Sequence, residues 1–224
     1  MRTNAKSVFN GDPPHPVREV PFAIFRIWWI VFAVAALPTI LRQAGVSPLW
    51  LPLICCLVGI AAVFPLKRMD AARLTTRSVL GSLVFGAILT LLSGIATLLT
   101  KLGLTALRIP FAKKQVLALL IAESSPPALI VLFVAVCVLT PVLEEVLFRK
   151  LLFGYWREIH SRSAFFGTAL LFAAAHLFPL GIPGLFLLGC GLQYLYLRRG
   201  NLACAMIAHG TVNTIAFAVN LWMR

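Results

Sequence analysis

The sequence predicts an all-α protein, a polytopic membrane helix bundle with about seven transmembrane helices and one or two interfacial helices. Its composition is 60% hydrophobic and only 12% charged, with a mean hydropathy of +0.94, which is far more apolar than a soluble domain. Apolar runs of about 17 to 22 residues recur along the chain, the length that crosses a hydrocarbon core of roughly 30 Å as a helix. Short loops that carry most of the basic residues separate these runs, as in polytopic membrane proteins.

The expected spans follow one another with little chain between them. They cover about residues 22–41, 49–66, 78–100, 127–147, 164–178, 184–197 and 202–222. The fifth and sixth are short and flanked by proline and glycine, so their ends are open. Residues 111–123 are too few to span and carry their basic residues at one end, which favours an interfacial helix. Residues 148–160 are expected to form a helix that leaves the membrane along the cytoplasmic surface.

The positive charge of the chain is explained by membrane topology. The net charge of +13 would also suit a nucleic-acid-binding protein, but the basic residues are scattered over short loops and form no stripe with interleaved aromatics. With the N-terminus in the cytoplasm, most of them fall on the inner side; the loop with Lys101, Arg108, Lys113 and Lys114 is the exception. We expect a multi-pass protein of a prokaryotic cytoplasmic membrane, in contact with the bilayer and not with nucleic acid. The oligomeric state cannot be read from the sequence.

Polar residues divide the chain into two regions. Residues 1–126 comprise a polar, proline-bearing tail, three spans and the interfacial helix, and the tail lacks the features of a secretory signal, so the first span is expected to be retained. Residues 127–224 comprise four spans that contain glutamates, histidines and an asparagine, so chemistry is expected here. The five cysteines fall within spans at no metal-ligand spacing and are interpreted as small apolar core residues.

Glu144 and Glu145 lie where the apolar fourth span ends, and Arg149 follows. Charges at membrane depth are costly unless they are paired or used, so this cluster is a candidate functional site. Glu145 and Arg149 are four residues apart, in the favourable order for an ion pair on one helix face. Adjacent helical residues point about 100° apart, which leaves Glu144 facing elsewhere. A poorly solvated carboxylate can serve as a general base near neutral pH.

Two further motifs supply polar groups in the fifth and seventh spans. Phe172-Ala-Ala-Ala-His176 ends the fifth span, and His209-x-x-x-Asn213 places a histidine and an asparagine on one face of the seventh. At a rise of 1.5 Å per residue, Glu144 lies about 5 Å, His209 roughly 10 Å and His176 about 18 Å from the cytoplasmic face. Tilt would reduce the last value. We therefore expect these groups to meet in the cytoplasmic half of the bilayer.

Taken together, the three motifs resemble a known signature. Glu144-Glu145-x-x-x-Arg149, Phe172-x-x-x-His176 and His209-x-x-x-Asn213 are similar to the motifs of the CAAX-prenyl-protease and bacteriocin-processing family of glutamic-type intramembrane proteases, also called CPBP or ABI proteins. The resemblance covers about residues 127–222. It implies that Glu144 and His176 activate water and that His209 with Asn213 forms the oxyanion site. Glu145 and Arg149 would support this site as a pair.

The chemistry of the residues agrees with peptide hydrolysis, which needs a base, an oxyanion donor and exclusion of bulk water. No nucleophilic Ser or Cys motif and no H-E-x-x-H accompanies these groups. A carboxylate with two imidazoles is also a credible zinc set, so Glu144, His176 and His209 as metal ligands stay open, although the resemblance favours a reaction without metal or other cofactor.

Three functions follow from these observations. The leading hypothesis is an intramembrane endopeptidase that cuts a membrane-associated protein or peptide, of CAAX type or bacteriocin type, near the cytoplasmic face. A proteolytically silent scaffold or immunity protein of the same fold is the alternative; the complete motif set speaks against it. A proton-coupled transporter is a third, because intramembrane Glu and His also form proton relays, but the spans show no inverted repeat.

Overall fold

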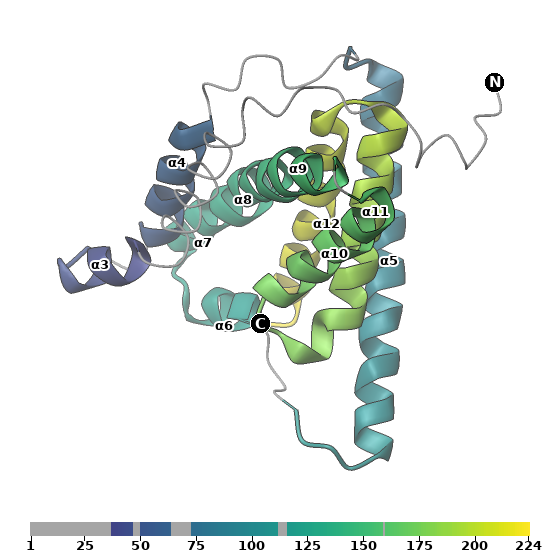
Figure 1. The fold of residues 1–224 in the computed structure, drawn as a ribbon. Helices are drawn as coiled ribbons and strands as arrows, with labels where there is room; N and C mark the ends of the chain where they lie inside the picture. The colour runs from purple at the N-terminus through teal and green to yellow at the C-terminus, as the bar shows by residue number, and fades with distance from the viewer. Residues whose placement is uncertain (1–36, 47–49, 64–72, 112–115, 159) are drawn as a thin grey trace.

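The computed structural model describes residues 37–46, 50–63, 73–111, 116–158 and 160–224, and every regular element within them is helical. The elements are α3 (Leu37–Gln43), α4 (Leu51–Val63), α5 (Thr76–Ala106), α6 (Val116–Glu123), α7 (Pro126–Phe133), the π-helical η3 (Val134–Leu139), α8 (Thr140–Glu145), the π-helical η4 (Val146–Phe153), α9 (Gly154–Arg157), α10 (Ser161–Ala175), the 3-10 turn η5 (Pro179–Gly181), α11 (Ile182–Arg199) and α12 (Leu202–Trp222). The expected all-α bundle is confirmed (Figure 1).

Among the described residues, four helices are long and apolar enough to cross a membrane, and the chain is an integral membrane protein. They are Thr76–Ala106, Pro126–Arg157, Pro179–Arg199 and Leu202–Trp222, which correspond to the expected third, fourth, sixth and seventh spans. The expected fifth span is the shorter apolar helix Arg162–Ala175, and the second contains the 13-residue α4. Most of the expected first span lies outside the described residues.

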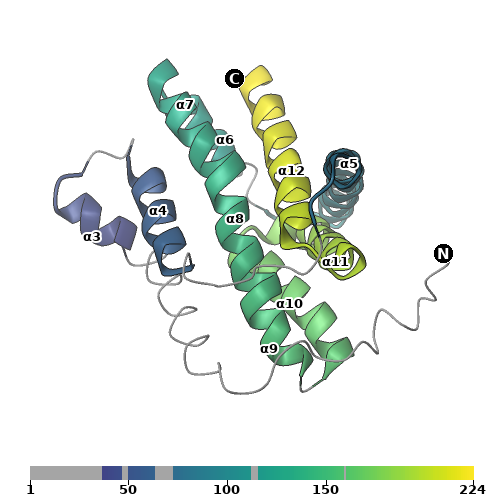
Figure 2. The same ribbon diagram turned by 90° about the horizontal axis from the view of Figure 1, so that it is seen from above.

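The fourth span differs from the expectation at its C-terminal end. The chain stays helical without interruption from Pro126 to Arg157, and Figure 2 shows α7, α8 and α9 as one long rod. The segment that was expected to leave along the membrane surface instead continues the axis of the span. The reason is local: η4 widens the helix immediately after the glutamates without breaking it, because π turns insert a residue while keeping the backbone hydrogen-bonded.

The long rod separates two groups of helices. In Figure 2, α3 and α4 lie on one side of it, and α10, α11, α12 and α5 lie on the other. Small residues let the second group pack closely: a Cβ on Gly86 of α5 would lie 2.5 Å from the Ala208 carbonyl oxygen of α12, and one on Gly184 of α11 would lie 2.5 Å from the Ser93 carbonyl oxygen of α5. Such contacts bring helix backbones together in membranes.

Short capping signals fix the helix ends that place the site. Thr75 and Ser78 form a reciprocal capping box at the start of α5. Gly200 ends α11 in the left-handed region at φ 60°, and the side chain of Asn201 accepts a hydrogen bond from the Ala203 amide at the start of α12. The turn between α11 and α12 is therefore tight, and α12 returns directly along the bundle.

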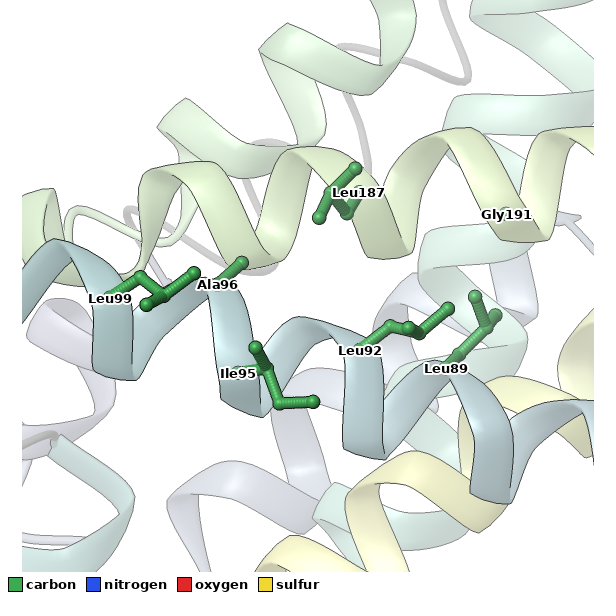
Figure 3. A pocket seen from close by; sticks show the side chains of 7 residues that line it. All are labelled: Leu89, Leu92, Ile95, Ala96, Leu99, Leu187 and Gly191. Atoms are coloured by element: carbon green, nitrogen blue, oxygen red, sulfur yellow. The ribbon is translucent and has the colours of Figure 1, made fainter.

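The core is apolar and contains the cysteines. All five cysteines are unpaired and four are buried, as predicted for small core residues. Ile121 of α6 is fully buried against the far end of the bundle. Figure 3 shows a separate aliphatic groove of about 460 Å³ between α5 and α11, lined by Leu89, Leu92, Ile95, Ala96, Leu99, Leu187 and Gly191. None of the polar residues expected at the site lines this groove.

Candidate active site

Glu145 and Arg149 form an ion pair in the interior of the bundle. Arg149 Nη1 lies 3.0 Å from Glu145 Oε1, and the two side chains are 2% and 0% exposed. Arg149 also donates from Nη2 to the Gly189 carbonyl oxygen of α11 at 3.2 Å. Burying a guanidinium is costly unless it is paired and hydrogen-bonded, and Arg149 meets both conditions while joining the long helix to α11.

His209 lies between the two glutamates. Its Nδ1 is 2.8 Å from Glu145 Oε1, and its Nε2 is 3.7 Å from Glu144 Oε2. The two carboxylates were expected to have separate neighbours because adjacent helical residues point in different directions. The structure brings both to one side chain, since an imidazole presents nitrogens at two different edges of its ring. Glu145 is therefore shared between Arg149 and His209.

Glu144 is the accessible member of this cluster. Its side chain is 23% exposed, while Glu145, Arg149 and His209 are at most 2% exposed. Its Oε2 atom has no hydrogen-bond partner among the described residues. The separation of 3.7 Å from His209 Nε2 is too long for a direct hydrogen bond. Glu144 is thus partly exposed as a side chain, while its Oε2 atom is buried beside His209.

Phe172 is the apolar centre of the site. Its ring is fully buried, and Arg149 Cζ lies 4.7 Å from the ring centroid, within the range of a cation–π contact. The His176 and His209 rings lie 4.8 Å and 5.6 Å from it. In the sequence, Phe172 is the first residue of a motif and has no predicted role; its spacing of one turn from His176 was the available signal.

His176 lies at the end of α10 on the far side of Phe172. Its Nδ1 is 2.8 Å from the Phe172 carbonyl oxygen, and because a carbonyl only accepts, Nδ1 donates and Nε2 is left without a proton in the neutral ring. The side chain is half-buried. No contact recorded within the described ranges joins His176 to Glu144, so the structure brings His176 to the cluster through Phe172 alone.

Asn213 is bound to the π-helical part of the fourth span. Its Nδ2 donates to the Val136 carbonyl oxygen at 2.8 Å. In this stretch the Thr140 amide donates to the carbonyl oxygen of Ala135, five residues earlier. In the same register the Val136 carbonyl would accept from the amide of residue 141. That residue is proline, which has no N–H to donate. Asn213 supplies the missing donor. Pro141 could have indicated from the sequence that a carbonyl in this helix lacks its amide donor. The π-helical register, which makes Val136 that carbonyl, could not be read from the sequence.

The arrangement can perform acid–base chemistry at one partly accessible point. Glu144, Glu145, Arg149 and His209 meet directly, His176 lies across Phe172, and Asn213 lies one turn beyond His209. Within the described ranges, no three His, Cys, Asp or Glu side chains are grouped as a metal-binding set.

Comparisons with known proteins show a similarity that is confined to this region. Residues 126–215 match the family model of Type II CAAX prenyl endopeptidase Rce1-like proteins. The UPF0177 protein YaiF of Lactococcus lactis subsp. lactis (strain IL1403) is 38% identical over 89 residues, which are 38% of this chain and 38% of that protein. The chain thus spans little more than a third of the length of this curated relative. No solved structure matches the chain. The matched stretch contains every side chain of the cluster described above, and in this stretch the chain is similar to the Rce1-like Type II CAAX prenyl endopeptidases.

Proposed function

We propose that the protein is an intramembrane endopeptidase that hydrolyses a peptide bond of a membrane-associated protein or peptide near the cytoplasmic face. The observation that carries this proposal is Glu144, whose side chain is partly exposed and whose Oε2 atom is buried beside His209 without a hydrogen-bond partner among the described residues. The family match over residues 126–215 supports proteolysis. The protein would act in a prokaryotic cytoplasmic membrane, with its N-terminus in the cytoplasm.

In this mechanism Glu144 takes a proton from water while the water oxygen attacks the scissile carbonyl. His176, whose Nδ1 is held by the Phe172 carbonyl, assists from its Nε2. His209 and Asn213 donate to the oxyanion; the hydrogen bond to Val136 uses one of the two Nδ2 hydrogens of Asn213 and leaves the other. When the C–N bond breaks, its electron pair stays on the amine nitrogen, which takes the proton from Glu144. No metal enters these steps.

The test replaces Glu144 with Gln in the producing strain. Loss of a general base lowers turnover by about 10²-fold or more, so an uncleaved membrane-associated precursor should accumulate in the proteome of the Glu144→Gln strain. The purified wild-type protein, after chelation and dialysis, should cleave that precursor, and Glu144→Gln should not, although the two proteins unfold at similar temperatures.

Three results would contradict the proposal. Full cleavage by Glu144→Gln would place the base elsewhere. Absence of cleavage by the purified wild-type protein would favour a silent scaffold or immunity protein. Cleavage that disappears on chelation and returns with zinc would recast Glu144, His176 and His209 as metal ligands. A control variant, Glu158→Gln, removes an exposed carboxylate near the end of the same helix and should process the precursor normally.

A further inference from the structure

Exposed arginines gather at one end of the seam between α5 and α11, the line along which these two helices contact each other. Arg77 lies in the first turn of α5, and Arg198 and Arg199 end α11. Arg199 reaches across the seam, because a Cβ on Gly81 of α5 would lie 2.9 Å from Arg199 Nη2. Gly81 is one helical turn from Arg77. Within the described ranges, no carboxylate is ion-paired with any of these arginines.

The same seam continues from the arginines into the aliphatic groove. Next along it, the Phe85 and Tyr194 rings lie with their centroids 6.4 Å apart, and Tyr194 is exposed. Beyond them Leu89 lies across Gly191, where a Cβ would collide with the leucine side chain. The groove of about 460 Å³ opens here, and Figure 3 shows Leu89 and Leu187 on its two sides. The seam is therefore cationic at its end, then aromatic, then aliphatic.

This order of groups matches the order of groups in a phospholipid. The headgroup layer of a bilayer is roughly 6 Å thick, and the hydrocarbon of one leaflet is about 15 Å thick. Along α11, Gly191 and Leu187 lie about 12 Å and about 18 Å from Arg199, which is the depth of an acyl chain whose phosphate lies at Arg199. Tyrosine rings favour the boundary between the two layers, and Tyr194 lies between Arg199 and Gly191.

We propose that the seam between α5 and α11 binds an anionic phospholipid, with its phosphate on Arg77 and Arg199 and one acyl chain in the groove. A guanidinium binds phosphate through paired N–H donors, so the phosphate supplies a negative charge that the described part of the chain does not. A zwitterionic headgroup brings a cation of its own, which offsets this gain. An acyl chain without a phosphate fills the groove but leaves the arginines unpaired. The inference is independent of the proposed endopeptidase function.

A lipid titration of the purified full chain tests the headgroup contact. Native mass spectrometry from detergent measures the Kd of phosphatidylglycerol, and phosphatidylcholine with the same acyl chains is the control lipid. We expect tighter binding of phosphatidylglycerol. Arg199→Gln should weaken it about fivefold, the factor that one basic side chain contributes near an anionic lipid surface. The matched variant Lys101→Gln removes an exposed cation from the opposite end of α5 and should leave the Kd unchanged.

A second pair of variants tests the acyl-chain contact. Ala96→Phe fills the groove and should weaken the binding of both lipids. Ala87→Phe adds the same ring to the opposite side of α5, at an exposed position, and should weaken neither. Without added lipid, both variants should unfold at the wild-type temperature. If Ala96→Phe does not fold, Arg199→Gln still decides, because phosphatidylglycerol should raise the unfolding temperature of wild type more than that of Arg199→Gln.

Three results would overturn the inference. Equal affinity for the two lipids, unchanged in Arg199→Gln, would show nonspecific contact with the bilayer only. Unchanged lipid binding by folded Ala96→Phe would remove the acyl chain from the groove. Displacement of phosphatidylglycerol by a prenylated peptide, and not by the same peptide without its prenyl group, would assign the groove to a substrate. None of these results bears on precursor cleavage by Glu144, so the proposed function can fail or hold separately.

Discussion

Phe172 holds the polar groups of the site together although it has none itself. Its buried ring contacts Arg149, His176 and His209 and meets the Phe148 ring edge-on at 5.3 Å. The negative face of an aromatic ring attracts a desolvated cation by about 2 kcal/mol, and an edge-to-face pair adds about 1 kcal/mol. Phe172 therefore stabilises Arg149 and fixes the distance between the two histidines.

Replacing Phe172 with Leu should lower both stability and activity. Loss of the cation–π contact and of one aromatic pair should cost about 2–3 kcal/mol of unfolding free energy, measured by denaturation in detergent micelles. The matched control is Phe217→Leu, because Phe217 is also buried and makes one edge-on pair, with Phe133 at 5.4 Å, but has no cation–π contact within the part of the chain that the structure describes. It should lose less stability and keep precursor cleavage. Equal losses in both variants would remove the special role of Phe172.

At the scale of residues, the sequence predicted which side chains form the candidate site better than it predicted which of them contact one another. The spacing of Glu145 and Arg149 predicted a pair, and the two side chains lie 3.0 Å apart; their supporting role, like the roles of the other site residues, stays a prediction. The contact of His209 with both glutamates could not be predicted, because it depends on how α12 docks against α8. Helical spacing predicts which residues are neighbours on one helix. It does not predict which side chain of a second helix contacts them.

At the scale of helices, hydropathy predicted the spans but not their irregularities. The expected third, fourth, sixth and seventh spans are long helices, since continuous apolar runs need no tertiary information to be recognised. The two π-helical segments and the unbroken extension to Arg157 were not predicted. Pro141 explains the first segment only when the register of the preceding carbonyls is known, and that register depends on contacts with Asn213.

The packing of α5 against α12 positions His209, and Gly86 makes it possible. A Cβ on Gly86 would meet the Ala208 carbonyl oxygen at 2.5 Å and the Thr211 Cβ at 2.8 Å, and backbone cannot yield as a flexible side chain does. We expect Gly86→Ala to lower the unfolding free energy by about 1–3 kcal/mol, as for other overpacked cores, and to reduce cleavage by shifting the residue next to His209.

Gly94 provides the control on the same helix. A Cβ there would have nothing within 4 Å, so Gly94→Ala should leave stability unchanged or raise it by up to about 1 kcal/mol through helix propensity. Thermal unfolding of both variants in the same detergent makes the comparison. If Gly86→Ala unfolds at the same temperature as Gly94→Ala and cleaves the precursor normally, the close approach of α5 and α12 does not constrain the site.

For the whole molecule, the placement of charge supports the proposed orientation in the membrane. Arg73 and Arg77 flank the start of α5, and Arg198 and Arg199 end α11. The two helices pack against each other, and Figure 1 shows these two ends on the same side of the bundle. The positive-inside rule supports the proposal that this end faces the cytoplasm. Lys101 and Arg108, at the opposite end of α5, are the charges that this orientation leaves outside.

Single cysteines at exposed helix ends test this orientation. In a background without the five native cysteines, cysteines replacing Thr75, before α5, and Ser163, in the first turn of α10, should resist an impermeant thiol reagent in intact cells and react after lysis. A cysteine replacing Thr105, near the end of α5, should react in intact cells. All three positions are exposed, so burial does not account for a difference. Labelling at Ser163 with protection at Thr105 would invert the topology and move Glu144 to the outer half of the membrane, where a cytoplasmic substrate cannot reach it.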